Sequence, residues 1–394
     1  MRIAIVSGAL ANKPGNGGNA WTRLQWVLGL RRLGFRVYFV EQIARETCVD
    51  RRGQVVNFED SRNCEYFRQI CRRFSLAETA SLIYEQGSAI AGLSLAQLTV
   101  VATQAELLVN ISGHLTLPAI KQPPRRKIYF DDDPGYTQFW HASGNAAARL
   151  EGHDAYYTVG ASIGNPSCSI PTGGIAWKPM QPLVVLEQWP ASTLPPTRGF
   201  TTIASWRGAY GRVECGGRTF GQKAHEFRKF IKLPRRTGER FEIALDIHAA
   251  EKNDIAQLEQ HGWQLADPTQ VALPDAYQNY IQASAAEFSV AQGIYVETDS
   301  GWFSDRTACY LASGRPALVQ DTGFSRALPV GEGLLTFRTL DQAAEGVRQI
   351  TSSYQRHCRA ARDLAVRCFD SDLVLGRILN EIGLAASNPG DVRC

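Results

Sequence analysis

Apolar runs and helically spaced apolar positions alternate along the start of the chain. Residues 2–7 are typical of a buried strand, and residues 8–18 form a glycine-rich loop. Over residues 19–33 the apolar side chains recur at helical spacing, Gly34 ends that helix, and residues 35–40 predict a second strand. A strand, a helix and a strand in this order predict two parallel strands joined by a right-handed crossover.

The alternation continues, stops at a proline-rich stretch and then starts again. Residues 177–199 contain five prolines and lack helical periodicity, which is typical of a linker between domains. Before the stretch we expect strands at 106–111, 127–130 and 154–159. After it we expect strands at 200–205, 241–246, 287–290, 293–297, 317–320 and 333–337, with helices at 223–231, 274–284, 340–368 and 371–384.

This order of elements predicts an α/β protein built from two Rossmann-like, doubly wound domains that face a cleft. We expect the first domain at 1–180, the linker at 181–199 and the second domain at 200–370. Residues 371–394 predict a C-terminal helix and tail, which either pack on the second domain or cross back over the linker.

Composition narrows the class of protein. The chain has 394 residues, of which 44% are hydrophobic and 20% charged, and this is enough for about two ordinary domains. The net charge is only +4 and the basic residues are dispersed, which favours a small anionic ligand over a nucleic acid. Nine cysteines without a Cys-x-x-Cys pair indicate reduced thiols. With no signal core and no apolar run of about 18 residues, we expect a cytoplasmic protein, leaving peripheral membrane contact open.

The segment 300–323 carries the most specific signal. A polar loop runs into a short helix that closes at Gly314, and a strand follows at 317–320. The N-terminus of a helix presents free N–H groups and a positive dipole end to an anion. The segment thus predicts a site for a diphosphate or a ribose, although an ordinary helix–turn–strand unit has the same pattern. The residues placed there are Ser304, Asp305, Arg306 and Thr307, with Thr322 and Gly323 after the next strand.

The glycine-rich loop after the first strand is a second candidate. Glycines remove the Cβ obstruction, so the backbone at Gly17 and Gly18 can approach a ligand, and a helix starting near Asn19 directs its N–H groups toward the cleft. A plain surface loop is the alternative. The loop is not a Gly-x-Gly-x-x-Gly fingerprint, because no acidic residue ends the second strand as a clear ribose ligand; Glu41 is the nearest candidate.

Two further candidates follow strands of the first domain. His114 comes after the strand 106–111, where open α/β sheets bind ligands, and a structural histidine is the alternative. Asp131, Asp132 and Asp133 follow the strand 127–130. Clustered carboxylates suit Mg²⁺ or Mn²⁺, but these acids lie away from the expected nucleotide. We therefore favour acceptor binding, general-base catalysis by one of them, or helix capping.

Together these features resemble glycosyltransferases of the GT-B fold, closest in plan to the retaining type with a Glu-x7-Glu motif. The resemblance implies that the second domain binds the nucleotide and the first binds the acceptor. It implies that Arg207 and Lys223 hold the diphosphate, that His114 lies against the donor sugar, and that no metal or cofactor is needed. The chain departs from the motif, since Gly301 and Cys309 stand where the two glutamates are expected. Asp305 and Arg306 are then the expected donor ligands, and retention or inversion stays open.

The resemblance implies a hexosyltransferase-like enzyme that uses a UDP or GDP sugar and a glycan, lipid or small-molecule acceptor, with His114 and Asp132 as the catalytic candidates. A nucleotide-sugar epimerase or hydrolase on the same plan is one alternative, because a fold does not fix a reaction. A non-catalytic nucleotide-sugar binding protein is the other, and the missing glutamates favour it.

Overall fold

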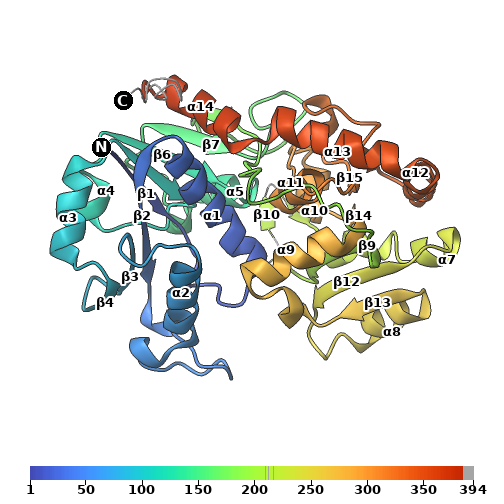
Figure 1. Ribbon diagram of the computed structural model, residues 1–394, viewed down its shortest axis with the longest axis horizontal. Coiled ribbons are helices and arrows are strands. Elements are labelled where there is room, and N and C mark those ends of the chain that lie inside the picture. Colours follow the sequence, from blue (N-terminus) through green and yellow to red (C-terminus); the bar gives the residue numbers. More distant parts are fainter. Residues whose placement is uncertain (209, 212, 216, 385–394) are drawn as a thin grey trace.

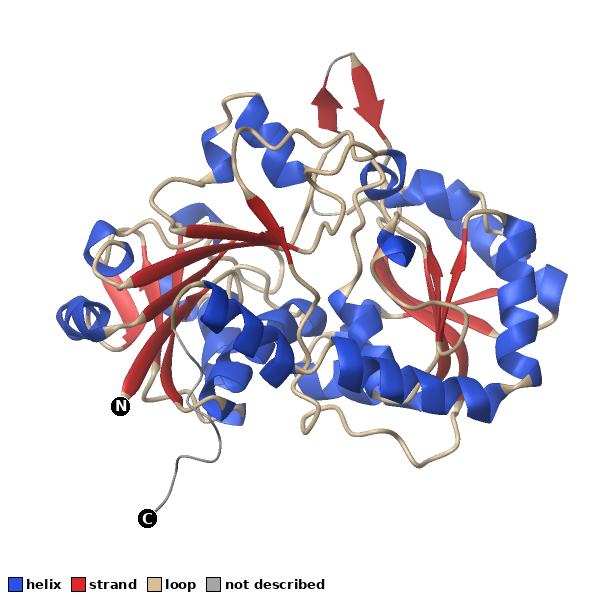
Figure 2. Cartoon of the chain, turned by 90° about the horizontal axis from the view of Figure 1, so that it is seen from above, coloured by secondary structure: helices blue, strands red, loops and turns tan. Residues whose placement is uncertain are grey.

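Two large β-sheets, each packed against helices, and a small two-stranded sheet make up the described chain (Figure 1, Figure 2). The computed structural model describes residues 1–208, 210–211, 213–215 and 217–384. The end of the predicted tail, 385–394, lies outside the described residues. The sheets confirm the expectation of a two-domain, doubly wound α/β protein. The domain boundaries given above stay a prediction.

The first sheet has eight strands in the order β4-β3-β2-β1-β5-β6-β7-β8. All neighbours pair in parallel except β3 and β4. The inner strands are almost wholly apolar because helices cover them, as is usual for parallel sheets. The strands are β1 Arg2–Ser7, β2 Phe35–Ile43, β3 Ala80–Tyr84, β4 Ala89–Gly92, β5 Leu107–Ile111, β6 Arg126–Asp131, β7 Ala155–Thr158 and β8 Trp177–Pro179. The helices are α1 Gly17–Arg32, α2 Arg62–Arg73, α3 Leu95–Gln104, α4 Pro118–Lys121 and α5 Tyr136–Ala142.

The second sheet has six parallel strands in the order β13-β12-β9-β14-β15-β16. Its strands are β9 Arg198–Ser205, β12 Phe241–Asp246, β13 Trp263–Ala266, β14 Ser284–Ser289, β15 Ala317–Gln320 and β16 Leu334–Phe337. Its helices are α6 Lys223–Arg228, α7 Leu233–Thr237, α8 Lys252–Gln260, α9 Pro274–Ala283, α10 Gly293–Glu297, α11 Asp305–Ala312, α12 Leu340–Ser352 and α13 Tyr354–Cys368, and the 3-10 turn η4 is Pro268–Val271.

A hairpin and the last helix extend from the second half and pack against the first. A hairpin, β10 Val213–Cys215 with β11 Arg218–Phe220, extends from the second half to α5, where Phe220 stacks on Phe139 with ring centroids 5.1 Å apart. The last helix, α14 Ser371–Glu381, lies against α1 of the first half (Figure 1). Its end is held there by the Tyr157 hydroxyl, which donates to Glu381 at 2.9 Å.

Two predicted elements were wrong. Residues 293–297 form helix α10 rather than a strand, although Ile294, Tyr295 and Val296 favour strands. The strand before them, β14, already pairs with β9 on one side and β15 on the other, so these residues lie beyond the sheet and have no strand partner. The long helix predicted at 340–368 is two helices, because Ser353 has φ −133° and ψ 39° and leaves the helical region.

The sequence led us to expect reduced cysteines and no membrane-spanning segment, and the structure bears on both expectations. The seven cysteines whose side chains are described are free, which agrees with reduced thiols; Cys215 and Cys394 fall outside that part of the chain. Among the described helices none is long and apolar enough to span a membrane.

Phe288 tests the account of the second core. Its ring is fully buried and stacks on Phe337 with centroids 5.0 Å apart. We expect Phe288→Ala to lower the free energy of unfolding by about 3–5 kcal/mol, because the loss of a buried ring leaves a cavity. Val366→Ala, at a 41% exposed helical position, is the control and is expected to change it by less than about 0.5 kcal/mol. Equal effects in urea unfolding would contradict the account.

Candidate functional site

The carboxyl ends of both sheets meet around one cavity. In the first sheet β1 leads outward through β2 and β3 and the chain then returns to β5, so the strand order reverses between β1 and β5. In the second sheet it reverses between β9 and β14. Open α/β sheets bind ligands outside the strand ends at such points. A cavity of about 640 Å³ lies there, lined by residues at the ends of β9 and β12 and by residues that follow β1, β6, β9 and β14.

Eight of the thirteen predicted site residues line this cavity. They come from both halves of the chain, so the cavity lies between the two sheets. They are Gly17, Gly18, Asn19, Asp132, Lys223, Ser304, Asp305 and Arg306. The other five are Arg207, His114, Thr307, Thr322 and Gly323, which are not among the described residues that line it.

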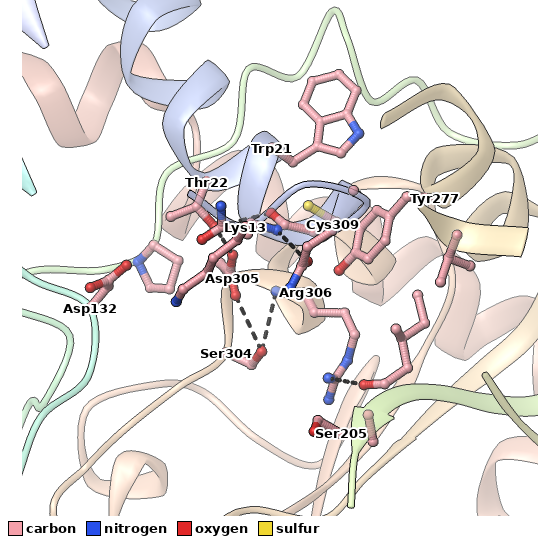
Figure 3. A pocket seen from close by; sticks show the side chains of 18 of the residues that line it. Lys13, Trp21, Thr22, Asp132, Ser205, Tyr277, Ser304, Asp305, Arg306 and Cys309 are labelled. Atoms are coloured by element: carbon pink, nitrogen blue, oxygen red, sulfur yellow. Dashed lines mark hydrogen bonds between the residues drawn. The ribbon is translucent and has the colours of Figure 1, made fainter. Parts of the chain in front are cut away.

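Glu41 holds the glycine-rich loop from beneath. Its carboxylate is fully buried and accepts the backbone N–H groups of Ala11 at 2.7 Å and Asn12 at 2.8 Å. Burial raises the pKa of Glu41 to about 7, although these bonds oppose the shift. Both carboxylate oxygens of Glu41, the nearest candidate for a ribose ligand, are thus bonded to the loop itself. The bonds fix the loop that carries Lys13 into the cavity (Figure 3).

The loop and the start of α1 press directly on the second half. A Cβ built on Gly17 would lie 2.5 Å from the carbonyl oxygen of Val271 and 2.8 Å from that of Leu273. The Trp21 indole donates to the carbonyl of Pro274 at 2.9 Å. Only glycine permits this approach, because any Cβ would overlap backbone atoms that cannot turn away. The helix α1 begins at Gly17, two residues before the predicted start.

The N-terminus of α11 faces the loop across the cavity. The Ser304 side chain caps the helix by accepting the N–H of Arg306 at 3.2 Å. The Thr22 hydroxyl of α1 donates to the Asp305 carboxylate, so that acid joins the two halves (Figure 3). Thr307 is fully buried on the inner side of the helix. The cavity therefore presents the first turn of an eight-residue helix, where an anion is favoured.

Two cations of the second half differ in how they are neutralised. Arg306 donates to Glu287 at 2.7 Å, to Ser289 at 2.8 Å and to the carbonyl of Ile203 at 2.6 Å. Burial opposes its charge, but Glu287 outweighs burial and raises the pKa of Arg306. Lys223 donates to the carbonyl of Val290 at 2.7 Å. Burial and then the charge of Arg306 lower the pKa of Lys223 to about 7.

The three consecutive acids have different surroundings. Asp131 is fully buried and accepts the side chains of Thr137, Gln138 and Thr158 at 2.7–2.8 Å; burial raises its pKa to about 6. The Asp132 carboxylate accepts hydrogen bonds from the Arg23 guanidinium at 2.9 Å and from the Ser112 hydroxyl. Burial favours the neutral form of Asp132, but Arg23 and Ser112 outweigh it and lower the pKa.

Asp133 also lines the cavity, and its partners belong to the second half. It accepts the hydroxyl of Tyr210 at 3.1 Å and that of Tyr295 at 3.3 Å. Burial and the neighbouring charge of Asp132 raise the pKa of Asp133 to about 6.

His114 lies near Asp132 without lining the cavity. It follows Ser112 and Gly113, whose φ values of 51° and 65° turn the chain sharply after β5. The residue is half-buried, and burial, followed by the charge of Arg23, lowers the pKa of His114 to about 3. The imidazole is therefore neutral at physiological pH.

The remaining predicted residues have structural contacts. Arg207 is about half exposed and pairs with Glu251 at the surface. The Thr322 hydroxyl donates to the carbonyl of Trp302 at 2.6 Å. Gly323 has φ +100°, and a Cβ there would meet Arg326 and Asp299. These contacts explain the polar residues after β15 without a ligand.

Sequence reasoning missed several residues of the cavity. Lys13 stands in the glycine-rich loop, and its cationic side chain at the end of a strand was a readable signal. Three more come from a region that no motif marks: Val271 ends η4, Ala272 follows it, and Tyr277 lies in α9. Tyr295 lies in the helix that was predicted as a strand.

Comparisons with solved structures find the same architecture. An alpha-glucosyltransferase in complex with UDP and a 13-mer DNA containing a central A:G mismatch has a TM-score of 0.59 and 10% identity, over 97% of this chain and 100% of that one. HepE of Anabaena in complex with UDP has a TM-score of 0.57 and 12% identity, over 97% and 100%. Sucrose-phosphate synthase of Thermosynechococcus elongatus has a TM-score of 0.52 and 12% identity, over 97% and 99%.

No protein-family model and no curated protein matches the chain. At identities of 10–12% the structural likeness shows the fold alone. The chain has the two-domain GT-B fold, as the sequence resemblance implied.

Gly17 tests the close approach of the two halves. We expect Gly17→Ala to lower the free energy of unfolding by about 1–3 kcal/mol, because the methyl group overlaps two carbonyl oxygens. Gly376→Ala, inside α14 with open space around the Cβ, is the matched control and should stabilise by up to about 1 kcal/mol. Chemical denaturation of both variants measures the difference. An unchanged free energy of unfolding in Gly17→Ala would show that the two halves can move apart at this contact without cost.

Proposed function

We propose that this chain, which has the GT-B fold, is a glycosyltransferase that moves a hexose from a nucleoside-diphosphate sugar, with UDP as the first candidate nucleotide, to an acceptor in the cavity between its sheets. The observation that carries the proposal is the cavity itself, where the N-terminus of α11 and the Lys223 ammonium come together. Solved structures of two GT-B proteins named above contain UDP, which supports the choice of nucleotide.

The second half supplies what a leaving diphosphate needs. Lys223 and the first turn of α11 offer positive charge and N–H donors on one wall. Lys13 reaches the cavity from the other half, and no carboxylate in the described chain pairs with it. As the bond between sugar and phosphate breaks, negative charge builds on the diphosphate, and cations fixed in advance stabilise that charge more in the transition state than before it. Ser304 and Asp305 would orient the donor beside them.

The first half would hold the acceptor. Asp132 is kept anionic by Arg23 and lines the cavity, so it suits binding of an acceptor hydroxyl. His114 is neutral, is close enough to Asp132 to feel its charge and is not among the described residues that line the cavity, which favours an indirect role over contact with the sugar. A glycan, a lipid or a small molecule remains the proposed acceptor class. DNA belongs in the acceptor screen, because one structure of the same fold contains it.

The alternatives differ in what they turn over. An epimerase or hydrolase would convert the donor as fast without an added acceptor as with one, and a binding protein would bind the donor tightly without turnover. The free thiols favour the cytoplasm as the proposed location.

Incubation of the protein with UDP-glucose and GDP-glucose, with and without Mg²⁺ and candidate acceptors, tests the proposal by nucleoside diphosphate release. Release that rises with one acceptor supports it; binding without release under all conditions contradicts it.

Lys223 should matter for affinity and Arg207 should not. We expect Lys223→Gln to weaken UDP binding by about 1–3 kcal/mol, the range for loss of a charge-assisted hydrogen bond. Arg207→Gln is the control, since Arg207 pairs with Glu251 outside the cavity, and should change affinity by less than about 0.5 kcal/mol. Isothermal titration calorimetry compares them. A larger loss of UDP affinity in Arg207→Gln than in Lys223→Gln would indicate that the diphosphate binds at Arg207.

UDP binding should also take up protons. The pKa of Lys223 is about 7 in the free protein, so at pH 8 most molecules carry a neutral amine there. A bound diphosphate restores the charged form, so we expect proton uptake at pH 8 and an affinity that falls as pH rises above 7. Titrations in buffers of different ionisation enthalpy measure the uptake. It should shrink in Lys223→Gln, and an unchanged uptake would assign it to another group.

A further inference from the structure

The three aspartates after β6 differ in the hydrogen-bonding capacity they have left. Asp131 accepts three side-chain donors at 2.7–2.8 Å from within its own half, and it is fully buried. Those bonds tie β6 to α5 and β7. Asp131 therefore has a structural role and does not face the cavity.

Asp132 faces the cavity but is held by a cation. The guanidinium of Arg23 donates to one carboxylate oxygen at 2.9 Å and the Ser112 hydroxyl donates to the other. The Arg23 side chain is only 5% exposed, so water screens this pair little. A carboxylate stabilised in its charged form in this way is a weak proton acceptor.

Among the described residues, no Lys or Arg side chain forms an ion pair with Asp133, and the hydroxyl groups that donate to it form long hydrogen bonds. Each of its oxygens accepts one tyrosine hydroxyl, Oδ2 from Tyr210 at 3.1 Å and Oδ1 from Tyr295 at 3.3 Å. These bonds are long for O–H donors, which prefer about 2.7–2.8 Å. Each oxygen keeps a lone pair, and the residue is half-buried in the cavity wall.

The charged and titratable groups around Asp133 come from several elements. Burial and Asp132 raise the pKa of Asp133, whereas Lys13, the Tyr210 hydroxyl and Arg23 oppose the rise, and the result is about 6. A carboxylate with this pKa is ionised at pH 7 and still basic enough to take a proton. The groups that face it are Asp132 on its own loop, Lys13 on the glycine-rich loop, Arg23 on α1, Tyr136 on α5, Tyr210 before β10 and Tyr295 on α10.

We propose that Asp133, rather than Asp132, is the catalytic residue that accepts the proton of the acceptor hydroxyl, an inference that rests on the function proposed above. The acceptor oxygen forms a bond to the anomeric carbon of the sugar while the bond from that carbon to the diphosphate breaks. The hydroxyl proton passes to an Asp133 oxygen, and the electron pair of the broken bond leaves with the diphosphate.

The two walls of the cavity set the direction of attack. Asp133 and Asp132 belong to the first half, whereas Lys223 and the start of α11 belong to the second. Figure 3 shows Asp132 on one side and Arg306 on the other, with Lys13 and Asp305 between them. Deprotonation of the acceptor at Asp133 of the first half, with departure of the diphosphate toward Lys223 and α11 of the second half, would make the displacement in-line, and such a displacement inverts the anomeric carbon.

Hydrolysis of UDP-glucose, with water as the acceptor, tests the proposal in the full-length protein. We expect Asp133→Asn to lower kcat by about 100-fold or more, within the range for loss of a general base. UDP affinity and the melting temperature with UDP should stay near those of the unmodified protein, because no hydrogen bond in the described chain joins Asp133 to Lys223 or to the first turn of α11. Asp363→Asn, an exposed aspartate on α13, is the control and should leave kcat unchanged.

The pH dependence of activity and the anomer of the released glucose distinguish a catalytic role of Asp133 from a structural one. Activity should fall below about pH 6 as Asp133 becomes protonated. Tyr210→Phe removes a donor to Asp133, so its acid limb should shift to higher pH. Because the sugar of UDP-glucose is α-linked, NMR should show β-glucose first.

The contradicting results are distinct from a failure of the proposed function. An Asp133→Asn kcat within about threefold of normal, an unmoved acid limb in Tyr210→Phe, or α-glucose as the first product would overturn the role of Asp133 while leaving a glycosyltransferase. If UDP-glucose binds but is not turned over with water or any acceptor, the proposed function and this inference both fail.

Discussion

The close approach of α1 to the second half is the contact on which the site depends. At Gly17 the backbone of the first half lies against the carbonyl groups of Val271 and Leu273, leaving no room for a side chain. The Trp21 indole and the Thr22 hydroxyl, about one turn further along α1, then donate hydrogen bonds to Pro274 and Asp305. With the hairpin on α5 and the packing of α14 on α1, this contact brings the strand ends of the two sheets around one cavity.

Some buried charges around that cavity are paired with opposite charges and others are not, and this difference determines which ligand the cavity suits. A charge removed from water is costly unless it is paired, and Arg23 with Asp132 and Arg306 with Glu287 are paired within their own halves. These pairs shape the walls but are already satisfied. Lys223 has only a carbonyl partner and Lys13 has no carboxylate partner in the described chain. The positive charge that remains suits a diphosphate, which would complete the pairing.

Much of the fold could be predicted because strand burial in parallel sheets leaves long apolar runs. The strands at 2–7, 241–246 and 317–320 have the predicted bounds, and their order places the two reversal points. The error at 293–297 arose because local propensity says nothing of whether a sheet edge is free. The sequence predicted less well which polar side chains reach the cavity, because that depends on the partner each side chain finds in the fold. Glu251 holds Arg207 at the surface, and the backbone N–H groups of the loop hold Glu41.

A crystal structure of the protein with UDP at saturating concentration tests the central claim most directly. The account predicts a diphosphate in the cavity, within hydrogen-bond distance of the Lys223 ammonium and of a backbone N–H in the first turn of α11. The Lys223 side chain should then have left the carbonyl of Val290 or share its protons with it. UDP bound elsewhere on the chain, or an empty cavity at saturation, would contradict the claim that this cavity is a nucleotide site.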